Sequence, residues 1–232
     1  MFVDVMIRRR ARLDEPMEAL NARIVAQLMA VPGFWGEGKT AANAPFEQGE
    51  TGSLDLRKAL RDGLSGQIVY MPRFAGYLSK DVAKADDTTR IRLDTDKIDP
   101  AAFCNETLPQ LITIFGSYRG YVETDAKVRA ADWEIARQET RKTGRSIDGR
   151  DSILRIWPVC WFDEELSRRS FGIGVQEAIA RAAPECEHAE VVAGCAFLIV
   201  TSAIVAGPNL DAIDARIKSR LRAGAPAQRG AA

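Results

Sequence analysis

Residues 151–174 constrain the fold of this chain more than any other segment. Their sequence, DSILRIWPVCWFDEELSRRSFGIG, has an apolar and aromatic run that ends at Asp163, followed by two acids, two arginines and Gly172. The apolar run is typical of a buried strand, and acids before arginines complement the dipole of a helix. Asp163 suits the N-cap of that helix, and Gly172 suits the position just past its end. The segment therefore predicts a buried strand that runs directly into a short helix.

The rest of the chain predicts strands and helices in irregular succession. Residues 2–8 alternate between apolar and polar side chains, as a half-buried strand does. Two apolar runs flank Ala193-Gly194 and predict a β-hairpin over residues 188–200. Apolar residues at helical spacing predict helices over residues 17–31, 54–64, 99–115, 175–183 and 210–221.

Several further segments carry weaker patterns. Residues 68–71 and 90–96 indicate strands, and the charged residues 81–89 indicate a solvent-exposed loop. Residues 118–124 carry no decisive pattern, and residues 132–140 fit either a strand or a helix.

The order of these elements predicts the fold class. Strands do not alternate regularly with long helices, so a doubly wound parallel sheet is disfavoured. We expect an α+β fold with a mixed or mainly antiparallel sheet and helices packed on it. The sequence predicts a single domain over residues 1–223, whose halves 1–141 and 151–223 would follow similar plans, and a disordered tail over residues 224–232.

Composition and charge exclude several classes of function. Lys and Arg together number 32, as do Asp and Glu, so the formal net charge is zero. Binders of nucleic acid or of membrane surfaces usually carry a basic excess, so we expect neither activity. The sequence shows neither a signal-peptide pattern nor an apolar run of membrane-spanning length, which predicts a cytoplasmic protein. The four cysteines lack C-x-x-C spacing and sit beside apolar residues, which predicts buried, reduced thiols.

Residues 33–40, GFWGEGKT, match the phosphate-binding loop pattern G-x-x-x-x-G-K-T. A functional loop of this kind follows a buried strand and opens a long helix whose amides hold phosphate. Here a helical stripe precedes Gly33, and Pro45 follows soon after Thr40. A nucleotide-binding enzyme that uses Gly33–Thr40 is therefore the alternative function, and a surface loop with Trp35 docked on the core is the favoured interpretation.

Other chemistry receives less support from the sequence. Cys186, His188 and Cys195 can meet at the predicted hairpin, but their spacing matches no zinc signature. The acids at 94 and 96 fit the wet face of a strand, and those at 163–165 fit the start of a helix. The sequence therefore predicts no catalytic residue, no cofactor and no metal site, and the protein is expected not to be an enzyme.

The C-terminal third carries a pattern found in a known family. The pattern consists of IWPVCWFDEEL at 156–166, RSFG at 169–172, the helical residues 175–183, the apolar strand 197–201 and the helix 210–221. Together these segments resemble the bacterial immunity protein 52 family, which occurs in polymorphic-toxin and type VI secretion systems. Arg168 stands where the pattern would have a cysteine.

The resemblance implies a cytoplasmic antitoxin that blocks a cognate secreted toxin, often a nuclease domain, by stoichiometric binding. A nuclease site is electropositive and bears metal, so acidic side chains of the inhibitor would be natural contacts. The expected toxin-contact residues are Asp94, Asp96, Asp163, Glu164, Glu165 and Trp35. Helix capping remains the favoured role of the last three acids. The sequence leaves open the identity of the toxin and whether the protein forms a homodimer.

Overall fold

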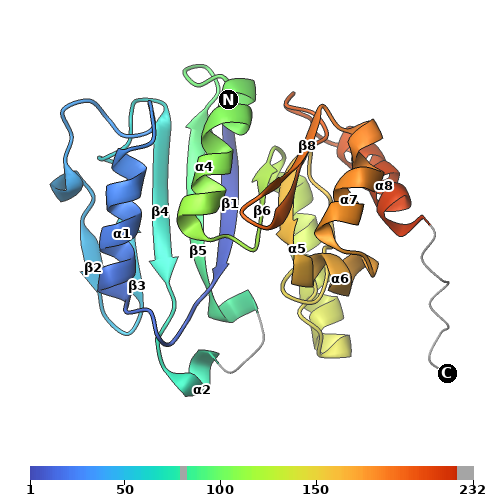
Figure 1. Ribbon diagram of the computed structural model, residues 1–232, viewed down its shortest axis with the longest axis horizontal. Helices are drawn as coiled ribbons and strands as arrows, with labels where there is room; N and C mark the ends of the chain where they lie inside the picture. Colours follow the sequence, from blue (N-terminus) through green and yellow to red (C-terminus); the bar gives the residue numbers. More distant parts are fainter. Residues whose placement is uncertain (79–82, 224–232) are drawn as a thin grey trace.

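One antiparallel sheet forms the centre of the molecule. The computed structural model describes residues 1–78 and 83–223, and within them nine strands pair in the order β2-β3-β4-β5-β1-β6-β7-β9-β8 (Figure 1). The strands are β1 (Phe2–Arg10), β2 (Phe46–Gln48), β3 (Gly52–Asp55), β4 (Leu64–Tyr70), β5 (Asp86–Asp94), β6 (Arg119–Glu123), β7 (Val159–Asp163), β8 (His188–Val192) and β9 (Cys195–Ile199). The predicted tail over residues 224–232 lies outside the described residues.

The helices pack on this sheet, which confirms the predicted α+β class. They are α1 (Met17–Met29), α2 (Ala75–Leu78), α3 (Pro100–Ala102), α4 (Leu108–Phe115), α5 (Ala126–Thr143), α6 (Glu164–Phe171), α7 (Val175–Ala182) and α8 (Pro208–Arg222). A π-helical segment over Phe103–Thr107 joins α3 to α4, so the helix predicted over residues 99–115 changes its hydrogen bonding just before Pro109.

Strand β1 joins the strands β2–β5 to the strands β6–β9. It pairs with β5 over its whole length, from Phe2 opposite Asp94 to Arg10 opposite Asp86. On its other side it pairs with β6, from Asp4 opposite Glu123 to Arg8 opposite Arg119. Both partners belong to the first expected half, and the pairing of β6 with β7 extends the same sheet into the second.

The segment that first suggested the fold forms the elements predicted for it. The Asp163 carboxylate accepts a hydrogen bond of 2.9 Å from the amide of Leu166, and Gly172 ends α6 with a φ of 74°. Trp161 and Phe162 are buried. The hairpin β8–β9 turns at Ala193 and Gly194, which both have positive φ, as a two-residue hairpin turn requires.

Two sequence-based predictions are wrong, and one open alternative is decided. Residues 86–89 begin β5 instead of forming an exposed loop, because Arg150 and Arg73 neutralise the buried Asp86 and Asp87. Residues 54–64 form the end of β3 and a turn instead of a helix, although their leucines are buried as expected. Residues 132–140 are helical and belong to α5, whose N-cap Asp125 accepts hydrogen bonds from two backbone amides.

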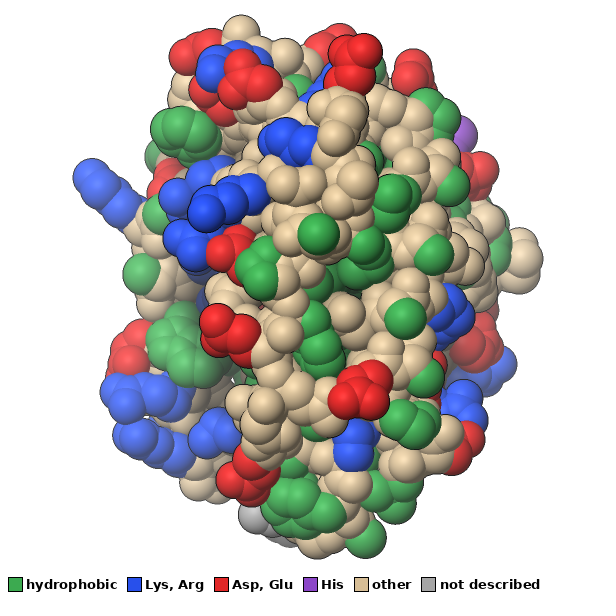
Figure 2. Space-filling view, turned by 90° about the vertical axis from the view of Figure 1, so that its left-hand side faces the viewer, with side chains coloured by type: hydrophobic (Ala, Val, Ile, Leu, Met, Phe, Trp, Pro, Cys, Tyr) green, Lys and Arg blue, Asp and Glu red, His purple; other side chains and the backbone are tan. Residues whose placement is uncertain are grey.

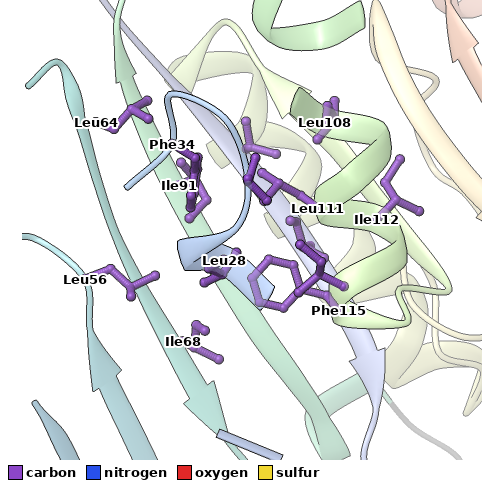
Figure 3. Close-up of a cluster of buried hydrophobic side chains, with 14 of the residues drawn as sticks. Leu28, Phe34, Leu56, Leu64, Ile68, Ile91, Leu108, Leu111, Ile112 and Phe115 are labelled. Carbon is purple, nitrogen blue, oxygen red and sulfur yellow. The ribbon is translucent and has the colours of Figure 1, made fainter. Parts of the chain in front are cut away.

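The two faces of the sheet are covered differently. On the front face, apolar side chains from β1, β4, β5, β7 and β9 form one cluster with α1 and α4. Figure 3 shows Leu28 of α1 and Phe115 of α4 beside Ile68 and Ile91 of the sheet. On the reverse face, α6, α7 and α8 cover an apolar cluster whose buried strand residues come from β6, β7 and β9, with Met6 of β1 and Ala189 of β8 partly buried against it. The reverse face of β3, β4, β5 and the start of β1 carries mainly polar side chains.

Among the glycines of the described residues, Gly120 of β6 leaves the least room for a side chain. A Cβ atom at this position would lie 2.0 Å from Trp161 Cζ2 and 2.4 Å from the backbone oxygen of Met6. Neither partner can move freely, because Trp161 is buried and Met6 belongs to the neighbouring strand β1. We therefore expect Gly120→Ala to lower the free energy of unfolding by about 3 kcal/mol, measured by urea denaturation.

Gly76→Ala is the matched control for this substitution. Its Cβ would meet nothing closer than Phe74 at 3.9 Å, and the added methyl group favours the helical conformation of α2. Equal stability of the two variants would show that the packing between β1, β6 and β7 is not as tight as described.

Candidate functional site

The polar reverse face of β3, β4, β5 and β1 is the candidate site, and we call it the open face. Its side chains are Ser53, Asp55, Ser65, Gln67, Arg90, Arg92 and Asp4. They alternate along each strand with buried residues such as Ile91 and Val5, so the pleat of the sheet directs them away from the core. A concavity of about 400 Å³ lies on this face, lined by Pro45, Glu47, Ser53, Asp55, Arg57, Ser65, Gly66, Gln67, Arg90 and Arg92.

Lys and Arg side chains are concentrated beside this concavity. Figure 2 looks onto the edge of the molecule that β2 and β3 form, and blue side chains gather along its left-hand margin, on the side of the reverse face. Red and green side chains lie between them, so the surface combines cationic, acidic and apolar groups.

Asp4 holds the two central arginines of the open face. Its carboxylate accepts hydrogen bonds from Arg90 Nη2 at 2.5 Å and from Arg92 Nε at 3.0 Å. Only 10% of the Asp4 side chain is exposed, against 52% and 47% for the arginines. Burial raises the pKa of Asp4, but the hydrogen bonds and charges of the two arginines outweigh it, so the pKa lies below its usual value.

A second carboxyl group lies beside Asp4 on the neighbouring strand. Glu123 of β6 stands directly opposite Asp4 in the register of β1 and β6. Burial raises the pKa of Glu123 and the charge of Asp4 adds to the rise, although the nearby arginines oppose it. The pKa of Asp4 is therefore lowered and that of Glu123 is raised, because the arginines outweigh burial only at Asp4.

Asp4, Arg90, Arg92 and Glu123 form a row of charges, and exposed aromatic side chains lie at both of its ends. The Arg92 guanidinium lies 5.9 Å from the ring of Phe2, and Arg129 of α5 lies 5.8 Å from the ring of Trp133. More than half of each aromatic side chain is exposed. Arg129 also approaches Glu123 at 4.0 Å, so α5 forms a wall beside the row.

The geometry of the open face is suited to binding through charge and hydrogen bonds. An arginine offers five N–H donors in a fixed plane, and this arrangement matches carboxylate groups. In residues 1–78 and 83–223, no group of three or more His, Cys, Asp or Glu side chains is placed to hold a metal ion.

The residues that the sequence proposed as toxin contacts do not form one site. Asp94 and Asp96 lie near the start of β1, where the amino group of Met1 is 3.8 Å and 3.1 Å from their carboxylates. Asp163 forms an ion pair with Arg10 at the other end of β1. The two groups are separated by the length of the strand, which is on the order of 27 Å.

The acids at 163–165 bind other parts of the protein. Asp163 caps α6, and Glu164 Oε2 accepts a hydrogen bond of 2.7 Å from the amide of Val175. That backbone hydrogen bond, together with Arg168, lowers the pKa of Glu164. Glu165 contacts Arg10 at 3.1 Å. The favoured capping role is confirmed for Asp163, and contact with a toxin stays a prediction for all three.

Residues 33–40 form a loop at the edge of the core. Trp35 is partly buried against the core, as the favoured interpretation expected, and its Nε1 donates to the Lys39 carbonyl at 3.2 Å. Lys39 Nζ donates to the Leu60 carbonyl at 2.9 Å. Helix α1 precedes this loop and a single 3₁₀ turn over Ala41–Asn43 follows it. The loop therefore lacks the strand and the long helix that surround a phosphate-binding loop.

Sequence reasoning did not identify the row formed by Asp4, Arg90, Arg92 and Glu123. The strand prediction for residues 90–96 placed Arg90 and Arg92 on a wet face, and residues 2–8 placed Asp4 on another. The missing information was that β1 and β5 pair with each other, because their residues are far apart in the sequence.

Comparison with known proteins adds no family. No protein-family model matches the chain, and the search of curated proteins gives no match either. None of the helices in the described ranges is long and apolar enough to cross a membrane. The class that the structure itself defines is an α+β protein with a nine-stranded antiparallel sheet.

Because the pKa values of Asp4 and Glu123 shift in opposite directions, replacing each residue by its neutral amide should change the free energy of unfolding in opposite directions. Because the folded pKa of Asp4 is lowered, its contribution to stability is present above its unfolded pKa of about 3.9 and is lost at lower pH. We expect Asp4→Asn to lower the free energy of unfolding by about 2 kcal/mol at neutral pH. The loss should shrink in acid, measured by urea denaturation across the pH range.

Glu123→Gln serves as the partner experiment. Because the folded pKa of Glu123 is raised, stability is lost as the pH rises through that value, and the neutral side chain removes this loss. The variant should therefore be more stable than the natural protein at neutral pH and equal to it in acid. Destabilisation by both substitutions at neutral pH would contradict the assignment.

Proposed function

We propose that the protein is an immunity protein that binds a cognate secreted toxin and neutralises it by stoichiometric blocking. The supporting observation is the open face, where half of a large sheet has no helix packed on its reverse side among the described residues. The kind of partner, a secreted toxin, is taken from the resemblance of residues 151–221 to immunity proteins. The toxin, in this proposal, is a nuclease domain, and the protein meets it in the cytoplasm without contacting nucleic acid or membrane.

The side chains of the open face are typical of residues that contribute to protein binding. Arginine and aromatic residues are enriched among those that carry most of the binding free energy in interfaces. Here Arg90 and Arg92 lie within a row whose ends carry the exposed rings of Phe2 and Trp133. Because Asp4 holds both arginines in place, a partner would lose less side-chain entropy on binding them.

One further group in the wall of the open face supports binding. Arg129 Nη1 is buried and has no hydrogen-bond partner in the described parts of the chain. Because this nitrogen is itself inaccessible, a bound molecule would instead contact the exposed ring of Trp133 beside Arg129. The proposal therefore includes Trp133 in the interface with the toxin.

Co-expression with a candidate toxin, taken from a gene next to the one for this protein, tests the proposal. We expect growth to be rescued and a one-to-one complex to appear in size-exclusion chromatography with light scattering. Failure of the natural protein both to rescue growth and to bind the toxin would refute the immunity function. The same chromatography of the protein alone determines whether it forms a homodimer.

Gln67→Trp places a bulky side chain in the concavity of the open face. We expect this variant to lose rescue, because the indole would occupy the space that the toxin needs. Gln176→Trp is the matched control, since Gln176 is exposed on α7. If Gln67→Trp protects as well as Gln176→Trp, the toxin binds elsewhere on the protein.

The nucleotide-binding alternative is tested separately at Lys39. Because Lys39 Nζ is bonded to the Leu60 carbonyl in a loop without a following long helix, we expect no ATP binding by calorimetry for the natural protein or for Lys39→Ala. ATP binding by the natural protein that the substitution abolishes would establish the alternative function instead.

A further inference from the structure

Arginines of the open face are more exposed than the carboxylates with which they pair. Arg90 and Arg92 lie two residues apart on β5, so their side chains share one face, with the much less exposed Asp4 beside them. Arg57 shows the same relation, since its side chain is far more exposed than that of its partner Asp55. At these ion pairs, a partner would therefore meet the guanidinium groups before it meets the carboxylates of Asp4 and Asp55.

The two central arginines keep donors for a second ligand. Asp4 engages one nitrogen of Arg90 and two of Arg92, whereas each guanidinium has five N–H groups. Arginine binds carboxylates through two parallel hydrogen bonds, which gives strength and fixed geometry. Asp4 thus acts as a positioning residue for Arg90 and Arg92.

We infer that Arg90 and Arg92 form a docking site for a carboxylate-bearing segment of the partner protein. This inference rests on the proposed function and specifies the chemistry of its interface. It reverses the expectation from the sequence, in which acids of this protein would contact a basic toxin surface. A protein segment fits better than nucleic acid, because Glu47 and Asp55 line the concavity among the arginines, so the site suits single carboxylates and would repel a continuous phosphate backbone.

The chain supplies a matched control for this pair. Arg216 and Arg220 of α8 also share one carboxylate, that of Glu185, at 3.2 Å and 2.9 Å. Their side chains are 51% and 53% exposed, close to the values for Arg90 and Arg92. They lie on a helix and are not among the residues that line the concavity. The two arginine pairs therefore have similar ion pairing and exposure, but only Arg90 and Arg92 line the concavity.

The first test is a titration of the full protein at low salt with a decapeptide of Gly and Ser that carries two Glu residues, followed by NMR of the arginine Nε–H groups. We expect the signals of Arg90 and Arg92 to shift more than those of Arg216 and Arg220. The double variant Arg90→Gln/Arg92→Gln should bind the peptide about tenfold more weakly. Arg216→Gln/Arg220→Gln should bind it unchanged.

Three outcomes would overturn the inference. They are a lack of any shift at Arg90 and Arg92, an equal loss of binding in the two double variants, and tighter binding of a thymidine decamer than of the peptide. Thermal unfolding of each variant checks that it is folded. Arg90→Lys/Arg92→Lys provides a further measurement, since it keeps the charge and removes the planar fork; we expect intermediate affinity.

A second test uses the cognate toxin and separates the inference from the proposed function. If the natural protein rescues growth and Arg90→Gln/Arg92→Gln rescues it equally, the docking site is refuted and the immunity function stands. If the natural protein neither rescues growth nor binds the toxin but its Arg90 and Arg92 bind the peptide, the immunity function is refuted and the carboxylate site stands.

Discussion

The pairing of β1 between β5 and β6 is the interaction on which the rest of the structure depends. Its hydrogen bonds join β2–β5 on one side to β6–β9 on the other, so that one sheet runs from edge to edge. Its register also determines which side chains face each way, because Val3, Val5 and Ile7 must enter the front core. A shift by one residue would bury Asp4 in that core and move the valines to the reverse face. The same pairing that completes the core thus places Asp4 beside the arginines of β5.

The unequal covering of the two faces separates stability from binding. On the front face, α1 and α4 bury apolar side chains from most of the sheet. On the reverse face, the side chains buried under α6 to α8 come mainly from β6, β7 and β9. The apolar contribution to folding is therefore concentrated away from the open face. Substitutions at exposed positions there, such as Gln67, remove little of this core, so binding can change while the fold persists.

The sequence predicted the elements that depend on neighbouring residues. The strand and helix at 159–171 followed from an apolar run with its own cap, and the hairpin at 188–199 followed from its turn residues. Residues 86–89 were predicted wrongly, because Arg150 and Arg73, which neutralise their acids, come from distant segments. The open face escaped prediction for the same reason, since Asp4 meets Arg90 only after two remote strands have paired.

The central position of β1 also has a consequence for synthesis of the chain. This strand emerges from the ribosome long before either neighbour, since β5 begins at Asp86 and β6 at Arg119. At roughly 5–20 residues per second, β1 waits roughly 4–16 s for its first partner. Its long-range pairings also predict slow folding once the strands are available. During that interval its apolar side chains and both of its edges are unpaired, so nascent chains of this protein would be natural clients of chaperones.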